Sequence, residues 1–273
     1  MIKNRSFIEI SSFSNPRIKY LIKLRDKRVR DKENQFTIEG YREIHRAFHS
    51  KKITFHAIFT SPEYFIGKNE NKLIEKINTL TFVLPRKIFA KISYRDRPDG
   101  LLALCESPNF TFDIDKELDG DFFVIVEGVE KPGNLGTIIR TAEGAGVSSL
   151  IVADPRIDIL NPNVIRSSTG ILFTLPIYTC ELKEIISYLK AKNIDIIGVS
   201  PECKTVFYDY NFAKPVALLF GSEQYGLSEF AKSNLDDSVS IPMKGEADSL
   251  NLAISSGIVM YEVTKQKSVL QKN

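Results

Sequence analysis

Residues 122–146 read FFVIVEGVEKPGNLGTIIRTAEGAG, and this stretch decides the fold of the carboxyl-terminal half of the chain. It begins with a continuous apolar run, passes through a short loop that contains Pro132 and Gly133, and then continues at helical spacing. A continuous run of Phe, Val and Ile predicts a strand that is buried on both faces. The stretch therefore predicts a strand, a loop and a helix, which is the repeating unit of an α/β fold.

Similar apolar runs recur beyond this stretch, and helix-compatible segments separate most of them. They lie at residues 150–153, 175–178, 194–199, 216–220 and 239–241. Buried strands that alternate with helices predict a largely parallel sheet covered by helices. Because ligands bind at the carboxyl ends of the strands in such sheets, we expect the functional site in the loops that follow the strands.

The first hundred residues predict a second, smaller α/β domain. Residues 15–25 form an amphipathic basic helix, and residues 36–40 form a strand that leads into a helix over residues 41–48. Shorter apolar runs follow at residues 57–59, 81–83 and 101–104. The predicted organisation is a domain over residues 1–105, a linker over residues 106–119 and a second domain over residues 120–273.

The length and composition are those of an ordinary globular protein. The chain has 273 residues, of which 43% are apolar and 26% are charged, and this excludes disordered and collagen-like classes. No apolar run approaches a membrane span of roughly 18 residues, and the first residues lack the apolar core of a signal peptide. The three cysteines form no CxxC pair. We therefore expect a cytoplasmic protein with no membrane partner and no zinc site.

The charge is distributed unevenly between the two halves. Residues 1–105 contain 22 basic and 11 acidic side chains, a net charge of +11, whereas residues 106–273 contain 15 and 23, a net charge of −8. A basic module of this kind is typical of polyanion binding, because each phosphate that it neutralises releases counterions. A solvated basic surface without a ligand is the alternative that charge alone leaves open.

The helix after the first strand carries an unusual pattern of small residues. Gly136, Arg140 and Gly144 are spaced four apart, so that Arg140 lies on a face without side chains one turn above and below it. This pattern indicates the close approach of a ligand or a second subunit, although an exposed Arg140 paired with Glu143 is an alternative. Asn134 is placed to cap the helix. The glycines do not form the GxGxxG motif of a dinucleotide fold.

Two further clusters follow later strands. Residues 218–228 read LLFGSEQYGLS, where Gly221 allows the backbone to turn at the sheet edge and Glu223 lies beside it, either as a site residue or as a loop acid. Residues 241–253 read IPMKGEADSLNLA and lead from a strand into a helix, which Asp248 or Ser249 could cap.

In this order, the three clusters resemble the three motifs of the SpoU (TrmH-like) branch of the SPOUT methyltransferases. The resemblance covers residues 122–265, and residues 15–48 resemble, more weakly, the ribosomal-protein-like substrate-binding domain of that family. It implies transfer of a methyl group from S-adenosylmethionine to a ribose 2'-hydroxyl in RNA. It also implies a deep trefoil knot in the carboxyl-terminal domain and a homodimer.

The resemblance also implies which residues form the site. Backbone groups at Gly221, Ile241 and Leu250, with Met243 nearby, would hold the cofactor. The residues that match the family's catalytic positions are Asn134, Arg140, Glu223, Ser249 and Asn251. The family's usual base matches Arg140, but a guanidinium is almost always protonated, so Arg140 could instead clamp an RNA phosphate. Ser249 and Asn251 would orient the hydroxyl, Glu223 would orient Arg140 or Asn134, and no step requires a metal.

The expected function is therefore that of an RNA ribose 2'-O-methyltransferase acting on large-subunit ribosomal RNA. The basic leading domain favours ribosomal RNA, because family members that modify transfer RNA commonly lack such a domain. Methylation of transfer RNA is the first alternative. A catalytically silent RNA-binding dimer that keeps the knot as a scaffold is the second, and binding of the cofactor separates it from an enzyme.

Overall fold

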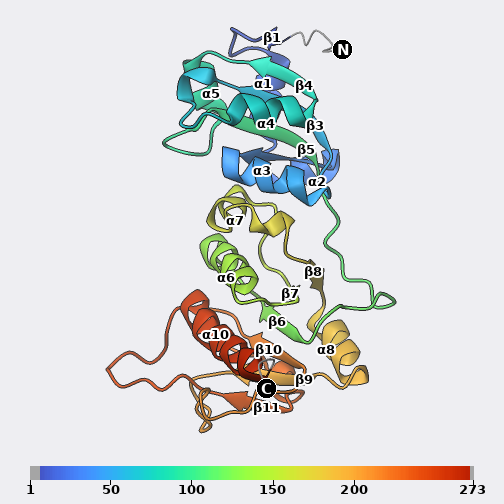
Figure 1. The fold of residues 1–273 in the computed structure, drawn as a ribbon, viewed down its shortest axis with the longest axis vertical. Helices are drawn as coiled ribbons and strands as arrows, with labels where there is room; N and C mark the ends of the chain where they lie inside the picture. The colour runs from blue at the N-terminus through green and yellow to red at the C-terminus, as the bar shows by residue number, and fades with distance from the viewer. Residues whose placement is uncertain (1–6, 271–273) are drawn as a thin grey trace. The chain divides into compact units, whose positions relative to one another are not determined.

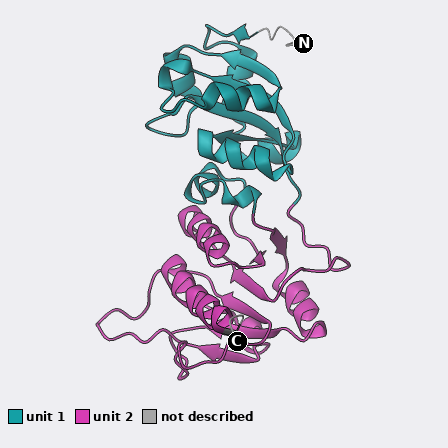
Figure 2. Cartoon of the chain, viewed as in Figure 1, with its two compact units in different colours: residues 1–109, 159–174 teal, residues 110–158, 175–273 magenta. Residues whose placement is uncertain are grey.

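The structure is a computed structural model that describes residues 7–270. The chain divides into two compact units, which Figure 2 shows in different colours. Unit 1 comprises residues 1–109 and 159–174, and unit 2 comprises residues 110–158 and 175–273. The sequence placed residues 159–174 in the carboxyl-terminal domain, whereas in the structure this segment groups with unit 1.

Unit 2 is built on a six-stranded sheet whose paired strands are all parallel (Figure 1). The strand order is β11-β9-β10-β6-β7-β8. The strands are β6 (Phe122–Glu127), β7 (Ser149–Ala153), β8 (Ile177–Cys180), β9 (Asp195–Val199), β10 (Val216–Phe220) and β11 (Asp237–Val239). Strands β6, β7 and β10 are buried at every residue, as their continuous apolar runs predict.

Helices cover this sheet and complete the α/β architecture of unit 2. They are α6 (Pro132–Gly144), α8 (Leu182–Ala191), α9 (Glu229–Lys232) and α10 (Leu252–Leu270). Helix α10 packs against α6. Helix α8 contributes buried side chains to the same hydrophobic core as the strands of the sheet. None of the helices in the described residues is both long and apolar enough to span a membrane.

Unit 1 contains a five-stranded mixed sheet in the order β1-β4-β3-β5-β2 (Figure 1). Its strands are β1 (Ile8–Glu9), β2 (Gln35–Glu39), β3 (Phe55–Thr60), β4 (Leu80–Val83) and β5 (Leu101–Glu106). Strands β1, β4 and β3 pair in parallel, and β5 pairs antiparallel with both β3 and β2. The predicted small α/β domain is therefore present.

The helices of unit 1 come from two separate parts of the chain. They are α1 (Pro16–Lys23), α2 (Lys27–Glu33), α3 (Tyr41–Ser50), α4 (Glu70–Ile77), α5 (Arg86–Ile92) and α7 (Pro162–Ser167), with short 3-10 turns η1 (Pro62–Tyr64) and η2 (Ile171–Phe173). Helix α7 contacts β2, and η2 contacts α3. The aromatic rings of Phe36 and Phe173 are 5.9 Å apart, so the core of unit 1 includes the distant segment.

Two predicted helix caps are wrong. Helix α6 begins at Pro132, because proline suits the first helical position, and its N-cap is Lys131. Asn134 consequently lies inside the first turn and is not a cap. Helix α10 begins at Leu252, so neither Asp248 nor Ser249 caps it. The side-chain oxygen of Asn251 accepts the backbone N–H of Ala253 there instead.

Candidate active site

The carboxylate of Glu223 joins two loops at the carboxyl edge of the unit 2 sheet. Glu223 follows β10, and it accepts hydrogen bonds from three groups at the start of α6. The backbone N–H groups of Glu130 and Lys131 lie 3.1 and 3.2 Å from its oxygens, and the side-chain amide of Asn134 donates to it at 2.9 Å. The first and second sequence clusters therefore meet at this carboxylate.

The third cluster joins the same network through Asn251. Its side-chain amide nitrogen donates to the side-chain oxygen of Asn134 at 3.1 Å. Asn251, Asn134 and Glu223 thus form a chain of hydrogen bonds across segments that are more than 80 residues apart in sequence. Of the two partners that the sequence allowed for Glu223, the structure shows Asn134.

This environment keeps Glu223 ionised. Partial burial favours the neutral acid, but the hydrogen bonds from Asn134 and from backbone N–H groups outweigh that effect, and the pKa of Glu223 lies below its usual value. The carboxylate is therefore a fixed acceptor at neutral pH. In this structure it acts as a positioning group for the side chain of Asn134.

A cavity of about 490 Å³ opens beside this network. It is lined by residues that follow β9 and β10 and by the loop that leads into α10. Every predicted cofactor residue contributes to its lining, as do three of the predicted catalytic residues: Gly221, Ile241, Met243, Leu250, Glu223, Ser249 and Asn251. The structure therefore brings these seven residues to one hollow.

Gly221 is required for the shape of this cavity. A Cβ atom added there would lie 2.0 Å from the backbone carbon of Gly226 and 2.1 Å from its oxygen. The backbone of Ser222 pairs with that of Gly226 and closes a tight loop on which Glu223 sits. The absence of a side chain at Gly221 therefore allows the loop to fold back against the end of β10.

Arg140 lies apart from the other predicted site residues. It is exposed on α6, does not line the cavity, and makes no side-chain hydrogen bond or ion pair with any residue in the described part of the chain. The alternative pairing with Glu143 is therefore absent there. A Cβ atom at Gly144 would lie 3.2 Å from the hydroxyl of Tyr261, so the glycine permits close packing of α6 on α10.

Sequence reasoning missed several residues around the cavity. Val199 and Ser200 line it at the carboxyl end of β9, and Tyr225 lines it from the loop after β10. The rule that sites lie at the carboxyl ends of parallel strands could have identified Val199 and Ser200. No comparable signal marked Tyr225, which is 70% exposed.

The structure gives no indication of a metal centre in the part of the chain that it describes. No group of three or more His, Cys, Asp or Glu residues between positions 7 and 270 could hold a metal ion. His45 and His49, which the sequence places four residues apart, stack on one another with ring centroids 4.1 Å apart.

Comparison with known proteins identifies the family. Residues 121–261 match the model of the SpoU rRNA Methylase family, a range that takes in most of unit 2, segment 159–174 of unit 1 and more than half of the chain. The chain belongs to the SpoU rRNA methylase family. Residues 15–103 match a second model, that of the MRM3-like substrate binding domain. Both family domains that the sequence motifs indicated are therefore confirmed.

Relatives in the SpoU family extend over most of the chain. RlmP of Bacillus subtilis, a 23S rRNA (guanosine(2553)-2'-O)-methyltransferase, is 26% identical over 257 residues, which cover 93% of this chain and 98% of the relative. A 23S rRNA (uridine(2479)-2'-O)-methyltransferase of Streptomyces viridochromogenes is 31% identical over 211 residues, which cover 74% of this chain and 73% of the relative.

Solved structures of SpoU-type proteins share the fold. A crystal structure of an RNA 2'-O ribose methyltransferase has a TM-score of 0.85 and 32% identity, with 96% of this chain and 100% of that chain covered. AviRb from Streptomyces viridochromogenes, in complex with the cofactor AdoMet, has a TM-score of 0.83 and 28% identity, with 93% and 98% covered. The predicted fold class is therefore confirmed, while the trefoil knot stays a prediction.

Proposed function

We propose that this chain transfers a methyl group from S-adenosylmethionine to a ribose 2'-hydroxyl of large-subunit ribosomal RNA. The observation that carries the proposal is the chain of hydrogen bonds from Asn251 through Asn134 to Glu223 at the mouth of the cavity. It unites all three SpoU motifs in one site. The two relatives described above, which act on 23S rRNA by name, support the choice of substrate.

The cavity of unit 2 suits the cofactor in size and lining. Its volume of about 490 Å³ falls within the range of roughly 300–1,000 Å³ that is common for small-molecule sites. Ile241, Met243 and Leu250 supply an apolar lining, and Gly221 lines the cavity where the tight loop after β10 begins. We assign the binding of S-adenosylmethionine to these four residues. When bound, its sulfonium supplies the methyl group.

The polar residues at the mouth of the cavity position the RNA hydroxyl. Glu223 holds the amide of Asn134, and Asn134 holds that of Asn251, so that both amides have fixed orientations. Ser249 is exposed in the cavity lining and is available to the ribose. Because a methyl transfer requires the oxygen in line with the departing group, such fixed groups accelerate the reaction by orientation.

Arg140 is the remaining catalytic residue of the proposal. A guanidinium matches phosphate oxygens in charge and geometry, so we assign Arg140 the role of a clamp on the RNA phosphate beside the reacting ribose. It is exposed and has no ion-pair partner between residues 7 and 270, so its charge is available to an incoming anion.

A homodimer is part of the proposal. On α10, Ile254 and Tyr261 are seven residues apart and therefore lie on one face, and they are 54% and 52% exposed. Arg140 is exposed on α6, which packs against α10. A second copy of the chain would cover this apolar face. Light scattering should report a dimer for the wild type and a lower mass for Tyr261→Glu, whereas a monomeric wild type would contradict the proposal.

The experiment that tests the function is methyl transfer from labelled S-adenosylmethionine to ribosomal RNA and to transfer RNA. Ribose-methylation mapping then follows on the RNA that accepts the label. The expected result is a 2'-O-methyl group at one site in large-subunit ribosomal RNA. Label in transfer RNA alone would favour the tRNA alternative. Cofactor binding without transfer to free RNA or to ribosomal subunits would leave a catalytically silent RNA-binding protein.

A further inference from the structure

Unit 1 contains a cavity of about 630 Å³ at the start of α3. Four arginines line it, namely Arg42, Arg95, Arg97 and Arg166, together with the three carboxylates of Glu43, Asp96 and Asp99. Three of the arginines come from the segment matched by the substrate-binding model, and Arg166 comes from α7 in the distant segment 159–174. The cavity is therefore built from both parts of unit 1.

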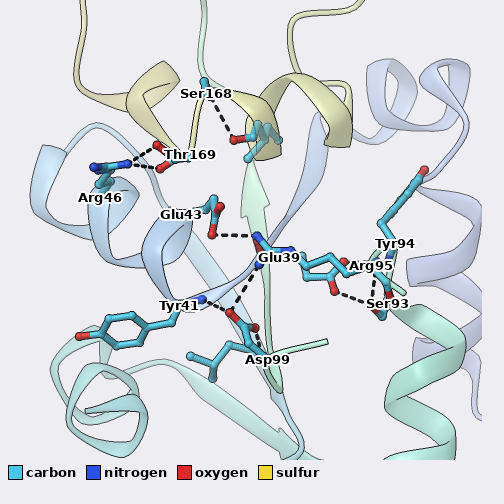
Figure 3. Close-up of polar contacts among 12 residues, drawn as sticks. Glu39, Tyr41, Glu43, Arg46, Ser93, Tyr94, Arg95, Asp99, Ser168 and Thr169 are labelled. Atoms are coloured by element: carbon cyan, nitrogen blue, oxygen red, sulfur yellow. Dashed lines mark hydrogen bonds and ion pairs between the residues drawn. The ribbon is translucent and has the colours of Figure 1, made fainter. Parts of the chain in front are cut away.

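Arg95 lines this cavity and is held by several partners (Figure 3). It pairs with Glu43 at 2.9 Å and with Asp99 at 3.7 Å, and it donates to the backbone oxygen of Glu39 at 2.9 Å. Gly40 makes room for it, because a Cβ atom there would lie 2.3 Å from the Arg95 guanidinium. The charges of Glu43 and Asp99 are thus directed toward Arg95.

The other three arginines have no such partners. Arg42, Arg97 and Arg166 are exposed, and none of them makes a side-chain hydrogen bond or an ion pair with the described residues. Asp96 is the remaining carboxylate of the cavity and is likewise without an ion-pair partner there. Three guanidinium groups around one hollow repel one another unless an anion enters, so the arrangement favours a negatively charged ligand.

The position of Arg166 is fixed by the packing of its segment on α3. Arg46 of α3 donates to both the backbone oxygen and the hydroxyl of Thr169 at 2.5 Å (Figure 3). Gly170 has a φ of +80°, and a Cβ atom there would lie 2.7 Å from the Cα atom of Glu43. The segment therefore packs against α3 too closely for a side chain at position 170, and Arg166 of the same segment lines the cavity.

We propose that this cavity binds a phosphodiester group of the substrate RNA, with Arg42, Arg97 and Arg166 as its ligands. Guanidinium groups match phosphate oxygens in charge and in geometry, whereas the charge of Arg95 is already paired with Glu43 and Asp99. The inference rests on the proposed function, since it names where unit 1 holds the RNA. It also assigns part of RNA binding to a residue from the segment matched by the methylase model.

The test measures binding of in vitro transcribed 23S ribosomal RNA as a function of salt. Arg42→Ala, Arg97→Ala and Arg166→Ala should each weaken binding roughly 3- to 10-fold and reduce the salt slope by about 1. Arg28→Ala is the matched control, because Arg28 is also exposed and lies outside the cavity. Equal losses in the control and the cavity variants would overturn the proposal, as would an unchanged salt slope.

A double-mutant cycle tests the role of the segment itself. Arg46→Ala removes the contacts to Thr169, so it should weaken RNA binding chiefly by releasing Arg166. The double variant Arg46→Ala with Arg166→Ala should then bind RNA about as weakly as Arg166→Ala alone. Fully additive losses would overturn this part of the proposal. Circular dichroism and S-adenosylmethionine binding confirm that the variants are folded.

Methyl transfer is recorded in parallel, so that the two proposals can fail separately. If the wild type methylates ribosomal RNA while the three cavity variants bind it normally, the cavity proposal is wrong and the proposed function stands. If the wild type methylates no RNA but the cavity variants lose affinity with a reduced salt slope, the proposed function fails and the phosphate site stands.

Discussion

The cavity of unit 1 and the cavity of unit 2 differ in the chemical groups that line them. Four arginines line the hollow of unit 1; three of them are exposed, and the fourth, Arg95, is paired with Glu43 and Asp99. The hollow of unit 2 is lined by glycine backbone, by apolar side chains and by polar residues such as Glu223, Ser249 and Asn251. The first cavity therefore suits an anion that is read by charge, and the second suits a ligand that is read by shape.

This difference predicts that binding at one cavity is sensitive to salt and that binding at the other is sensitive to added side-chain volume. Charge-based binding weakens as salt rises, because counterions compete for the same groups. Shape-based binding depends on close backbone packing, so that a single added methyl group can abolish it. If the two cavities are separate sites, a substitution in one should leave ligand binding at the other unchanged.

The largest effect is expected for Gly221→Ala. The new Cβ atom would overlap the backbone of Gly226, so the loop that carries Glu223 cannot keep its position. Cofactor binding and methyl transfer should become undetectable, while RNA binding by unit 1 should remain within about 2-fold. Calorimetry measures cofactor binding, and a filter-binding assay measures RNA binding. Gly133→Ala is the control, because its Cβ atom would have no neighbour within 4 Å. Normal cofactor binding by Gly221→Ala would contradict the shape argument.

The next effect is expected for Arg140→Ala. Arg140 makes no ion pair within the described residues and does not line the cavity, so folding and cofactor affinity should be unchanged. Methyl transfer should fall by roughly 10²- to 10³-fold, because a charged clamp on the substrate is lost. Single-turnover transfer measures this loss. Transfer at close to the wild-type rate would remove Arg140 from the mechanism.

A smaller effect, on RNA binding and not on cofactor binding, is expected for Gly170→Ala in unit 1. A positive φ disfavours alanine by roughly 1–2 kcal/mol, and the added Cβ atom would press on the backbone of Glu43. The segment that presents Arg166 should move, and RNA affinity should fall about 5-fold while cofactor binding is kept. Titration with RNA and with S-adenosylmethionine separates the two effects. Loss of both RNA binding and cofactor binding would show that the two cavities are not separate sites.

The smallest effect concerns pH. Hydrogen bonds hold the pKa of Glu223 below its usual value despite partial burial, so its contribution to stability is present above the unfolded pKa and is lost as the pH falls through the folded value. The Tm of the wild type should therefore fall more steeply below about pH 4.5 than that of Glu223→Gln. Calorimetric scans from pH 7 to pH 3 measure the difference. Parallel curves would mean that Glu223 does not titrate in this range.

Much of the unit 2 fold could be predicted from apolar runs. The runs at 194–199 and 216–220 contain strands β9 and β10. Two others were displaced by two residues: 175–178 for β8 and 239–241 for β11. Apolar runs report burial rather than strand pairing, so a buried residue such as Leu175 was counted as part of a strand that begins at Ile177.

The site was predictable to a lesser degree. The carboxyl-edge rule together with the SpoU motifs located the cavity residues. Capping preference predicted Asn134 as the helix cap, which is wrong, whereas the SpoU resemblance matched Asn134 to a catalytic position, and its amide donates to Glu223. The cavity of unit 1 was not predicted at all. It depends on contacts such as that between Arg46 and Thr169, which are 123 residues apart and leave no periodic signal in the sequence.

Segment 159–174 belongs to unit 1, and this limits how such proteins can be recombined. A graft that exchanged only the region of the substrate-binding model, residues 15–103, would leave Phe173 and Thr169 of the recipient facing a foreign partner. Unit 1 is therefore encoded by two separate stretches of the gene. A chimera designed to acquire a new RNA target should transplant α7 and η2 together with the amino-terminal domain.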